Sequence, residues 1–190
     1  MSIKGTETEK NLLKAFAGES QARNRYQMFA SQATKEGYHQ IAAIFLETAD
    51  NERIHANRFF HFLEGGDVEI TAMYPAGVVG NTKENLLAAA HGEHEEWADL
   101  YPAFAAKAKE EGFPKVAVAF EMIAKAELEH ENRYRKLAEN IEKELVFRRA
   151  EPRRWKCAKC GYVHEGTSAP GVCPACQHPQ EYFELKETNY

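Results

Sequence analysis

Apolar residues recur at helical spacing through most of the first 145 positions of the chain, and this pattern predicts four long helices. The helices are expected over residues 6–36, 38–64, 82–112 and 114–145. Pro102 lies inside the third pattern and is expected to kink that helix. About fifteen residues separate the second helix from the third, which is long for neighbouring helices and predicts a crossover along a helical bundle.

The helical part of the chain repeats itself with a displacement of 75 positions. The coinciding pairs include Tyr26 with Tyr101, Phe45 with Phe120, Glu52 with Glu127, and His55 with His130. Two helical hairpins related by such a duplication are expected to pack as a pseudo-symmetric four-helix bundle. Equivalent faces of the two hairpins would then converge on the axis between them.

Each hairpin carries one Glu-x-x-His sequence, Glu52 to His55 in the first and Glu127 to His130 in the second. Three residues advance about 300° around an α-helix, so the carboxylate and the imidazole lie on one face about one turn apart. A single copy is commonly part of a solvated face. Two copies in equivalent positions indicate ligands of a shared metal centre in a bundle.

Two further carboxylates complete such a centre if the repeat contains a one-residue insertion. Glu19 is the candidate in the first helix, and Glu93 lies one residue before the position equivalent to it. An extra residue between Glu93 and Tyr101 predicts a π-bulge, a feature that is frequent at functional sites. Glu96 shares a face with Glu93, whereas Glu95 points away. The candidate ligands are therefore Glu19, Glu52, His55, Glu93, Glu96, Glu127 and His130.

Apolar packing cannot account for five carboxylates in the core of a bundle. Without a cation, their mutual repulsion and desolvation would force most of them to protonate. Oxygen-rich ligands with two histidines suit iron or manganese. Two ferrous ions carry the same charge as two ferric ions with an oxo bridge, so such a site can change redox state without burying new charge. The alternative is that some of these carboxylates, Glu96 above all, lie on solvated faces.

Two tyrosines follow the candidate carboxylates of the first and third helices by about two helical turns, on about the same face. They are Tyr26 and Tyr101, and we expect them to donate hydrogen bonds to bridging carboxylates of the metal centre. The alternative is two core aromatic residues whose hydroxyl groups have structural partners. Four other histidines lack the support of the repeat and are expected at the surface or in packing positions: His39, His61, His91 and His94.

The bulk composition narrows the classes of function. A formal net charge of −5 and the lack of a long basic stripe argue against a nucleic-acid partner. No run of eighteen apolar residues occurs, so no transmembrane span is expected. The N-terminal sequence MSIKGTETEK has no apolar signal-peptide core, which leads us to expect a cytoplasmic location.

All four cysteines lie near the C-terminus as two Cys-x-x-Cys pairs, Cys157 with Cys160 and Cys173 with Cys176. Clustered thiols in a cytoplasmic protein indicate a tetrahedral metal site rather than disulfides. Zinc would make this a structural ribbon and iron a one-electron carrier, and the spacing leaves both open. The expected domains are a helical bundle over 1–146, a basic linker over 147–154, and a four-cysteine domain over 155–190.

Together these motifs resemble the rubrerythrin family over the whole chain. The resemblance rests on the duplicated Glu-x-x-His, the extra carboxylate in the third helix, and the C-terminal sequences CAKCGY and CPAC. It implies a mainly α protein, in which a ferritin-like four-helix bundle is followed by a small rubredoxin-like domain of strands and loops. The chain matches the family pattern at every ligand position.

The resemblance also implies a role for each ligand. It implies two bridging carboxylates, Glu52 and Glu127, and two terminal ones, Glu19 and Glu93. His130 would bind the iron that Glu93 binds. His55 and Glu96 would exchange on the other iron, with Glu96 binding the oxidised form and His55 the reduced form. The four cysteines would hold a mononuclear iron, which gives three irons per chain, two of them in a di-iron oxo site.

The function that the resemblance implies is a non-haem di-iron peroxidase that reduces hydrogen peroxide to water in oxidative-stress defence. Electrons would pass from rubredoxin or an NAD(P)H-linked reductase through the four-cysteine iron to the di-iron site. The chain has no Gly-rich dinucleotide fingerprint, so NAD(P)H is expected to bind that partner. A homodimer is implied, in which the rubredoxin-like domain of one subunit lies near the di-iron centre of the other. Two alternatives are an iron-handling ferroxidase and a zinc-ribbon protein whose bundle metals are structural.

Overall fold

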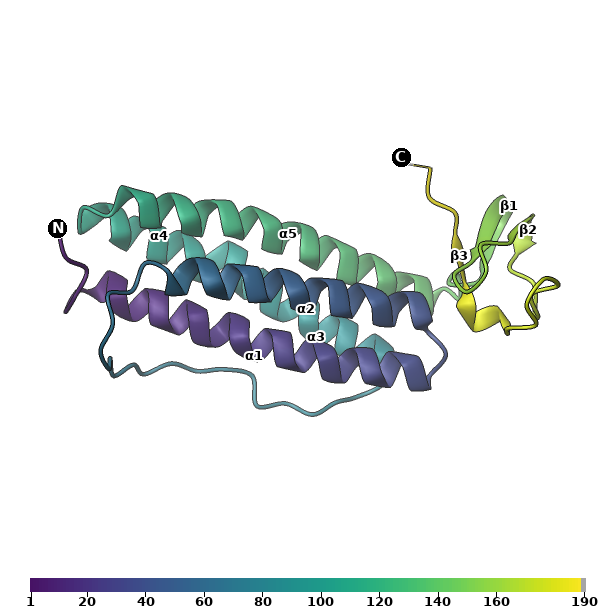
Figure 1. Cartoon of the computed structure of the whole chain (residues 1–190), viewed down its shortest axis with the longest axis horizontal. Helices are drawn as coiled ribbons and strands as arrows, with labels where there is room; N and C mark the ends of the chain where they lie inside the picture. The colour runs from purple at the N-terminus through teal and green to yellow at the C-terminus, as the bar shows by residue number, and fades with distance from the viewer. Residues whose placement is uncertain (189–190) are drawn as a thin grey trace.

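The apolar helical patterns form a bundle of long helices in the computed structural model, which describes residues 1–188 (Figure 1). The α-helices are α1 (Glu7–Lys35), α2 (His39–Phe60), α3 (Thr82–Glu95), α4 (Tyr101–Glu110) and α5 (Pro114–Glu142). A π-helix, η1 (Glu96–Leu100), joins α3 to α4, so these three segments make the third long helix. The predicted four-helix bundle is confirmed, although α2 ends at Phe60 rather than near residue 64. No helix among residues 1–188 is long and apolar enough to cross a membrane.

Two apolar clusters fill the bundle, one towards each end, and a polar layer separates them. Along α1, Leu12 belongs to one cluster and Tyr26 to the other, with Glu19 between them. The clusters follow in the same order along α5 and in the opposite order along α2 and along α3 and α4. This arrangement places the candidate ligands of all four long helices at one level of the bundle.

The connection between α2 and α3 is the predicted crossover. Residues 61–81 run back along the outside of the bundle, so α2 and the α3–α4 helix point in the same direction (Figure 1). The segment 67–81 contains neither helix nor strand. Near its middle, the Tyr74 hydroxyl donates a hydrogen bond of 2.8 Å to the backbone oxygen of Lys14 on α1. This bond fastens the crossover to the helix beneath it.

The predicted insertion in the second hairpin takes the form of the π-helix η1. Its five residues carry the chain from Glu93 on α3 to Tyr101 on α4 with one residue more than the first hairpin has between Glu19 and Tyr26. Pro102 lies in the first turn of α4, directly after the π-helix. The irregularity that the sequence predicts at Pro102 therefore lies in the π-helix η1. Pro102 follows in the first turn of α4, where a residue without a backbone N–H is tolerated.

The carboxylates that end the first helix of each hairpin cap the other hairpin. Glu36 Oε2 accepts a hydrogen bond of 2.9 Å from the backbone N–H of Thr82, at the start of α3. Glu111 Oε2 accepts one of 2.8 Å from the backbone N–H of Thr8, at the start of α1. Free N–H groups and the helix dipole at these starts favour a negative charge, so the two hairpins stabilise each other reciprocally.

The C-terminal part forms a small antiparallel sheet with strand order β2-β1-β3. Its elements are β1 (Arg148–Cys157), β2 (Val163–Ser168), the 3₁₀ turn η2 (Gln180–Tyr182) and β3 (Phe183–Leu185). Trp155 is buried at its centre, and the indole N–H donates a 3.0 Å hydrogen bond to the Gly166 oxygen. The expected linker over 147–154 needs correction, because β1 begins at Arg148. Pro152 is tolerated there since the pairing of β1 with β2 is irregular between Arg148 and Arg153.

The small domain rests on the end of the bundle where α1 turns into α2 (Figure 1). Two ring stacks mark this contact. His39 at the start of α2 stacks on Tyr182 with ring centroids 3.9 Å apart, and Tyr38 stacks parallel to Phe147 at 6.4 Å. His39 is thus a packing residue, as expected from its place outside the repeat.

Candidate functional site

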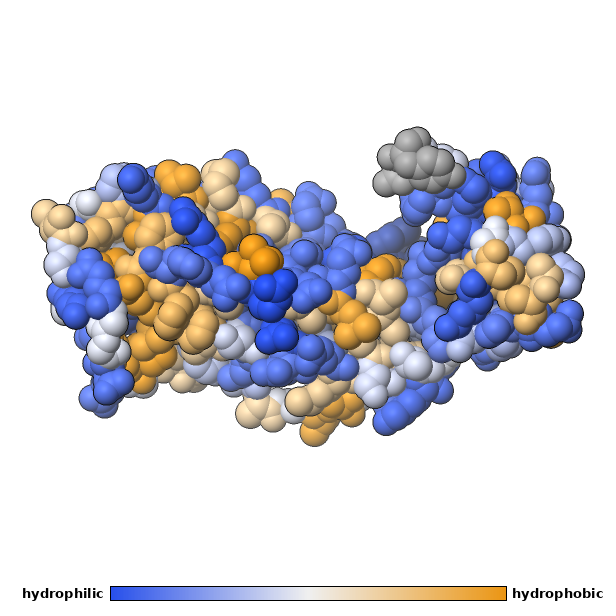
Figure 2. All heavy atoms as spheres, viewed as in Figure 1, coloured by the Kyte–Doolittle hydropathy of each residue, from blue (hydrophilic) through white to orange (hydrophobic). Residues whose placement is uncertain are grey.

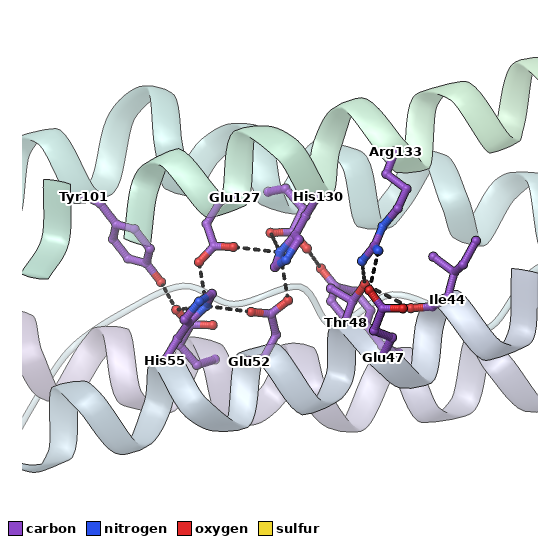
Figure 3. A network of polar contacts seen from close by, with 12 residues as sticks. Ile44, Glu47, Thr48, Glu52, His55, Tyr101, Glu127, His130 and Arg133 are labelled. Atoms are coloured by element: carbon purple, nitrogen blue, oxygen red, sulfur yellow. Dashed lines mark hydrogen bonds and ion pairs between the residues drawn. The ribbon is translucent and has the colours of Figure 1, made fainter. Parts of the chain in front are cut away.

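The structure brings six of the seven candidate bundle ligands together in the polar layer: Glu19, Glu52, His55, Glu93, Glu127 and His130. The helix α1 contributes one carboxylate, α3 contributes another, and α2 and α5 each contribute one Glu-x-x-His pair. Each ligand lies on the stripe of its helix that also carries the buried apolar residues, so all of them face the bundle axis. Figure 3 shows Glu52 and Glu127 reaching towards each other between His55 and His130.

The ligands form two overlapping groups, and within each group the ligand atoms lie within 4.8 Å of one another. The first group is Glu19, Glu52, His55 and Glu127, and the second is Glu52, Glu93, Glu127 and His130. Glu127 Oε1 lies 2.9 Å from His55 Nδ1, and Glu127 Oε2 lies 2.8 Å from His130 Nδ1. The Glu52 oxygens lie 2.9 Å and 3.3 Å from the same two nitrogens. Each shared carboxylate thus offers one oxygen to each group, as a bridge between two metal ions requires.

Several of these ligand atoms are buried and form no hydrogen bond of good geometry with any of residues 1–188, although the close contacts given above join some of them to one another. They are Glu19 Oε2, Glu52 Oε1, Glu93 Oε2, both oxygens of Glu127, and His130 Nδ1. Desolvation of an unpaired carboxylate costs several kcal/mol, and the unsatisfied atoms converge on a common space. A cation removes this penalty. Four carboxylates and two imidazoles around two overlapping positions fit a pair of iron ions.

Two of these carboxyl groups, those of Glu19 and Glu93, favour the protonated form if no cation is bound. Burial raises the pKa of Glu93 to about 8 and lifts the pKa of Glu19 well above its usual range. Burial alone would lower a histidine pKa, but the carboxylates in close contact with His130, that of Glu127 first, raise its pKa to about 12. Metal ions must therefore displace protons when they bind.

The two tyrosines approach the site, but not at the carboxylates that the sequence suggests. Tyr101 OH donates a 2.6 Å hydrogen bond to Glu19 Oε1, and Tyr26 OH donates one of 2.5 Å to Glu93 Oε1. The expectation of bonds to bridging carboxylates is thus wrong, because each tyrosine bonds the unshared carboxylate of the other hairpin. The side chains cross the bundle axis, which the repeat alone does not reveal.

Glu96, the seventh candidate, lies outside both ligand groups. It begins the π-helix η1, and burial followed by the charge of Glu93 raises its pKa well above the usual range. It lines a cavity of about 290 Å³ between α1, η1 and the crossover segment. His55 rather than Glu96 completes the ligand group of Glu19 in this structure.

Glu131 is a residue near the site that the repeat did not indicate. Its Oε2 accepts a 2.5 Å hydrogen bond from Trp97 Nε1 and lies 3.0 Å from His94 Nδ1, while its Oε1 accepts one of 2.6 Å from Arg135 Nε. Trp97 and His94 stand on either side of the junction between α3 and the π-helix. Glu131 therefore ties this junction to α5, directly beside His130. The repeat pairs Glu131 with Ala56, so only its place next to a ligand could have drawn attention to it.

The four cysteines meet in the small domain as predicted. The sulfur atoms of Cys157 and Cys176 are 3.7 Å apart, and so are those of Cys160 and Cys173. A disulfide needs about 2.05 Å, whereas a tetrahedron with metal–sulfur bonds of about 2.3 Å has edges of about 3.8 Å. The sulfur positions therefore fit four thiolates around one metal ion.

Comparison with known proteins agrees with this geometry. A family model described as Rubrerythrin matches residues 10–138, and one described as the rubrerythrin rubredoxin-like domain matches residues 155–184. The rubrerythrin of Porphyromonas gingivalis is 61% identical over 189 residues, which cover 100% of this chain and 94% of the relative. The rubrerythrin of Nitratidesulfovibrio vulgaris is 56% identical over 189 residues, which cover 100% and 99%. A solved structure of fully reduced, all-ferrous nigerythrin superposes with a TM-score of 0.64 at 32% identity, covering 97% of this chain and 92% of that one.

The two family models fall on the two parts of the chain that carry ligand groups. The bundle holds a di-iron site of glutamate and histidine ligands, and the small domain holds a rubredoxin-like site of four cysteines. The chain therefore belongs to the rubrerythrin family, whose members are peroxidase-like di-iron oxidoreductases implicated in oxidative-stress defence.

Proposed function

We propose that this chain reduces hydrogen peroxide to water, with electrons that pass from an NAD(P)H-linked reductase through the four-cysteine iron to the bundle site. The observation that carries the proposal is the fusion of a four-thiolate site to a bundle in which Glu52 and Glu127 are shared by two ligand groups. When bound, the two bundle irons supply Lewis-acid and electron-donor chemistry at these carboxylates. The apolar clusters above and below the polar layer keep bulk water from it.

The assignment of ligand roles is part of the proposal. Glu52 and Glu127 would bridge the two irons, Glu19 and Glu93 would be terminal ligands, and Tyr101 and Tyr26 orient the terminal pair by hydrogen bonds. His55 and Glu96 are alternative ligands on the Glu19 side, and here His55 lies in the ligand group while Glu96 faces the cavity. Replacing a carboxylate by a neutral imidazole compensates for a fall in metal charge, so His55 would hold the reduced iron and Glu96 the oxidised iron.

The route of electrons favours a homodimer as part of the proposal. Twelve residues separate His130 from the end of α5 at Glu142, so this helix alone carries the chain about 18 Å from the ligand groups before the small domain begins. Residues 1–146 contain 17 Lys and Arg against 24 Asp and Glu, whereas residues 147–190 contain 7 against 5. Opposite net charge would draw the small domain of one subunit to the bundle of another.

The proposal is tested by the flow of electrons in the holoprotein. The protein is fully reduced without oxygen, mixed with one equivalent of hydrogen peroxide, and followed by the visible absorbance of the thiolate-bound iron. Rapid return of the ferric colour with peroxide, and much slower return with O₂, is the expected result. Persistence of the reduced spectrum after peroxide is added would overturn the peroxidase assignment. No colour in any redox state would show that the cysteines hold zinc.

His55→Ala tests the ligand exchange separately. We expect this variant to lose peroxide turnover to a greater extent than it loses bound iron, because the carboxylates of the first ligand group remain. His91→Ala is the matched control, since His91 is exposed and lies outside both ligand groups. Wild-type turnover by His55→Ala would show that the exchange does not occur.

A further inference from the structure

A cavity of about 290 Å³ lies beside the first ligand group, under the crossover segment. Its inner wall is formed by α1, η1 and α4, and its outer wall by residues 71–75 of the crossover. Tyr74 is fixed in this wall by its hydrogen bond to the Lys14 oxygen. In Figure 2, apolar atoms gather along the lower edge of the bundle, where Figure 1 places part of this segment.

The cavity reaches the metal site through two residues. Glu96 lines it with its carboxyl group, and Tyr101 lines it while its hydroxyl bonds Glu19. Gly18, the residue before Glu19, also lines it and presents no side chain. A Cβ placed on Gly18 would lie 3.6 Å from the Tyr74 ring and 3.8 Å from Glu96 Oε1, so a side chain here would be in van der Waals contact with both and would take up part of the cavity.

The lining of the cavity is mainly apolar, with polar residues in the minority. Apolar and aromatic residues supply most of it, including Ala15, Ala72, Pro75, Leu100 and Phe104, and the polar residues of the lining are Lys14, Arg25, Thr71, Glu95 and Glu96. At the polar end, Glu96 is joined by Arg25, whose buried Nε–H has no hydrogen-bond partner among the residues that the structure describes. Apolar walls with a few convergent polar groups are the usual composition of a site for a small organic molecule.

The volume exceeds what hydrogen peroxide needs. A water molecule occupies about 30 Å³ in the liquid, so the cavity has room for about ten of them. Ligand pockets for small organic molecules begin near 300 Å³. A passage that served only hydrogen peroxide would need neither this volume nor an apolar wall.

We propose that this cavity binds the organic group of small alkyl and aryl hydroperoxides and directs their O–O group towards Glu96 and the first ligand group. The inference rests on the proposed peroxidase function and adds a substrate class to it. The reaction is ROOH + 2 e⁻ + 2 H⁺ → ROH + H₂O. The O–O bond breaks, and the electrons come from the same reductase chain. The distal oxygen leaves as water, and the alcohol is left in the cavity.

The test compares hydrogen peroxide with cumene hydroperoxide, using the reduced holoprotein and one electron donor. Ala72→Trp fills the outer wall of the cavity without touching a candidate ligand, and Thr71→Trp replaces it if that variant does not fold. Val78→Trp is the matched control, because Val78 belongs to the same segment, is 88% exposed and does not line the cavity. Binding of the product 2-phenyl-2-propanol to the resting holoprotein is measured by calorimetry as a readout that does not depend on turnover.

We expect the wild type to reduce both peroxides and to bind the alcohol. Ala72→Trp should lower kcat/KM for cumene hydroperoxide about 10- to 200-fold, abolish alcohol binding and leave hydrogen peroxide turnover unchanged. Turnover of hydrogen peroxide without turnover of cumene hydroperoxide in the wild type would overturn this inference and leave the proposed function standing. Failure with both peroxides would overturn the proposed function itself. Equal effects of Ala72→Trp and Val78→Trp would also contradict the inference.

Discussion

Two tyrosine hydroxyl groups hold the two unshared carboxylates of the bundle site. Tyr101 bonds Glu19 and Tyr26 bonds Glu93, in both cases across the bundle axis and out of contact with water. Each bond leaves the second oxygen of its carboxylate free and buried, directed at the place of a metal ion. The tyrosines thereby fix the orientation of a ligand before any metal arrives, which lowers the entropic cost of binding.

Tyr101→Phe should weaken the binding of one metal ion of the pair about 10- to 100-fold and leave the other little changed. The reason is that Glu19 belongs to the first ligand group alone. Titration of the metal-free protein with ferrous or cobaltous ions, followed spectroscopically, measures both affinities. Tyr26→Phe is the matched variant and should affect the other ion, through Glu93. The interpretation fails if both variants bind two ions with wild-type affinity.

Removal of the bundle metals should make stability depend strongly on pH. Folded Glu93 keeps its proton up to about pH 8, whereas an unfolded glutamate releases it near pH 4.3. The folded state then binds more protons than the unfolded state, so stability falls as pH rises through this window. The raised pKa of His130 also makes stability fall as pH rises above about 6.5. Glu52 has the opposite effect, because its pKa is lowered, but it is one group against two.

Urea unfolding of chelator-treated protein at about pH 5 and about pH 8 measures this effect, which should be of the order of a few kcal/mol. The metal-loaded protein serves as the control, because its ligands hold no exchangeable protons in that range. Metal-free protein that is more stable at the higher pH would contradict the proposed burial of these groups.

Most of the candidate ligands could be predicted from the sequence, because the repeat places equivalent residues in both hairpins. Glu93 needed the additional inference of an inserted residue, and the π-helix η1 confirms that insertion. Glu131 was inaccessible because its role depends on the three-dimensional approach of Trp97 and His94, which no spacing encodes. His94 itself was expected to be a surface or packing residue, and its contact with Glu131 gives it a more definite place beside the site.

At the scale of elements, the helix ends depend on carboxylates from the opposite hairpin. Glu111 accepts hydrogen bonds from the Thr8 hydroxyl and backbone N–H, and these bonds lower its pKa. Its contribution to stability is present above the pKa of an unfolded glutamate and is lost as pH falls below it. The start of α1 is therefore stabilised at neutral pH by a group that is about a hundred residues away in the chain.

Glu111→Gln should lower the free energy of unfolding by about 0.3–1 kcal/mol, because the amide keeps an acceptor but loses the charge at the helix start. Urea unfolding at neutral pH is the measurement. Glu110→Gln is the control, since Glu110 is exposed and its carboxylate pairs with Lys107 on the same helix. Equal effects of the two substitutions would show that the cap contributes nothing beyond general surface charge.

The element boundaries show what a sequence pattern contains and what it omits. The starts at Thr82 and Pro114 agree with the sequence pattern, and the structure shows a capping box of Asn81 with Glu84 at the first and a proline in the first turn at the second. The end of α2 at Phe60 does not agree with that pattern, since the following apolar residues Phe62 and Leu63 continue the helical pattern while packing from outside the helix. The expected linker turned out to be the first part of β1, because partner strands from later in the chain pair with a segment whose composition resembles a loop.

At the scale of the whole molecule, the two parts differ in what holds them together. The bundle has two large apolar clusters, whereas the small domain has one cluster around Trp155 that includes the metal-binding thiols Cys157 and Cys173. A domain of this size buries too little apolar surface to fold well alone. The bound metal therefore supplies much of its folding free energy.

Extraction of the metal from the cysteines should unfold the small domain and leave the bundle helical. Trp97→Phe leaves Trp155 as the single tryptophan of the chain, so its fluorescence reports on the small domain alone. We expect a red shift of this fluorescence on treatment with a thiol-reactive mercurial, with little change in far-ultraviolet circular dichroism. Restoration by ferrous ions and reductant is the control. Fluorescence that keeps its buried character after metal loss would show that the strands fold without it.

A hairpin of half this length, paired about a two-fold axis with an identical copy, would already present Glu19, Glu52 and His55 twice and would exchange its Glu36 caps reciprocally. Such an assembly is confined to two equivalent metal positions, since identical chains cannot differ at one of them. When the two hairpins belong to one chain, their sequences can differ, and so can the two metal positions. The extra residue in η1, and with it Glu96, exists on one side only. The two metal positions of the fused chain can therefore differ, which those of a symmetric pair of identical hairpins cannot.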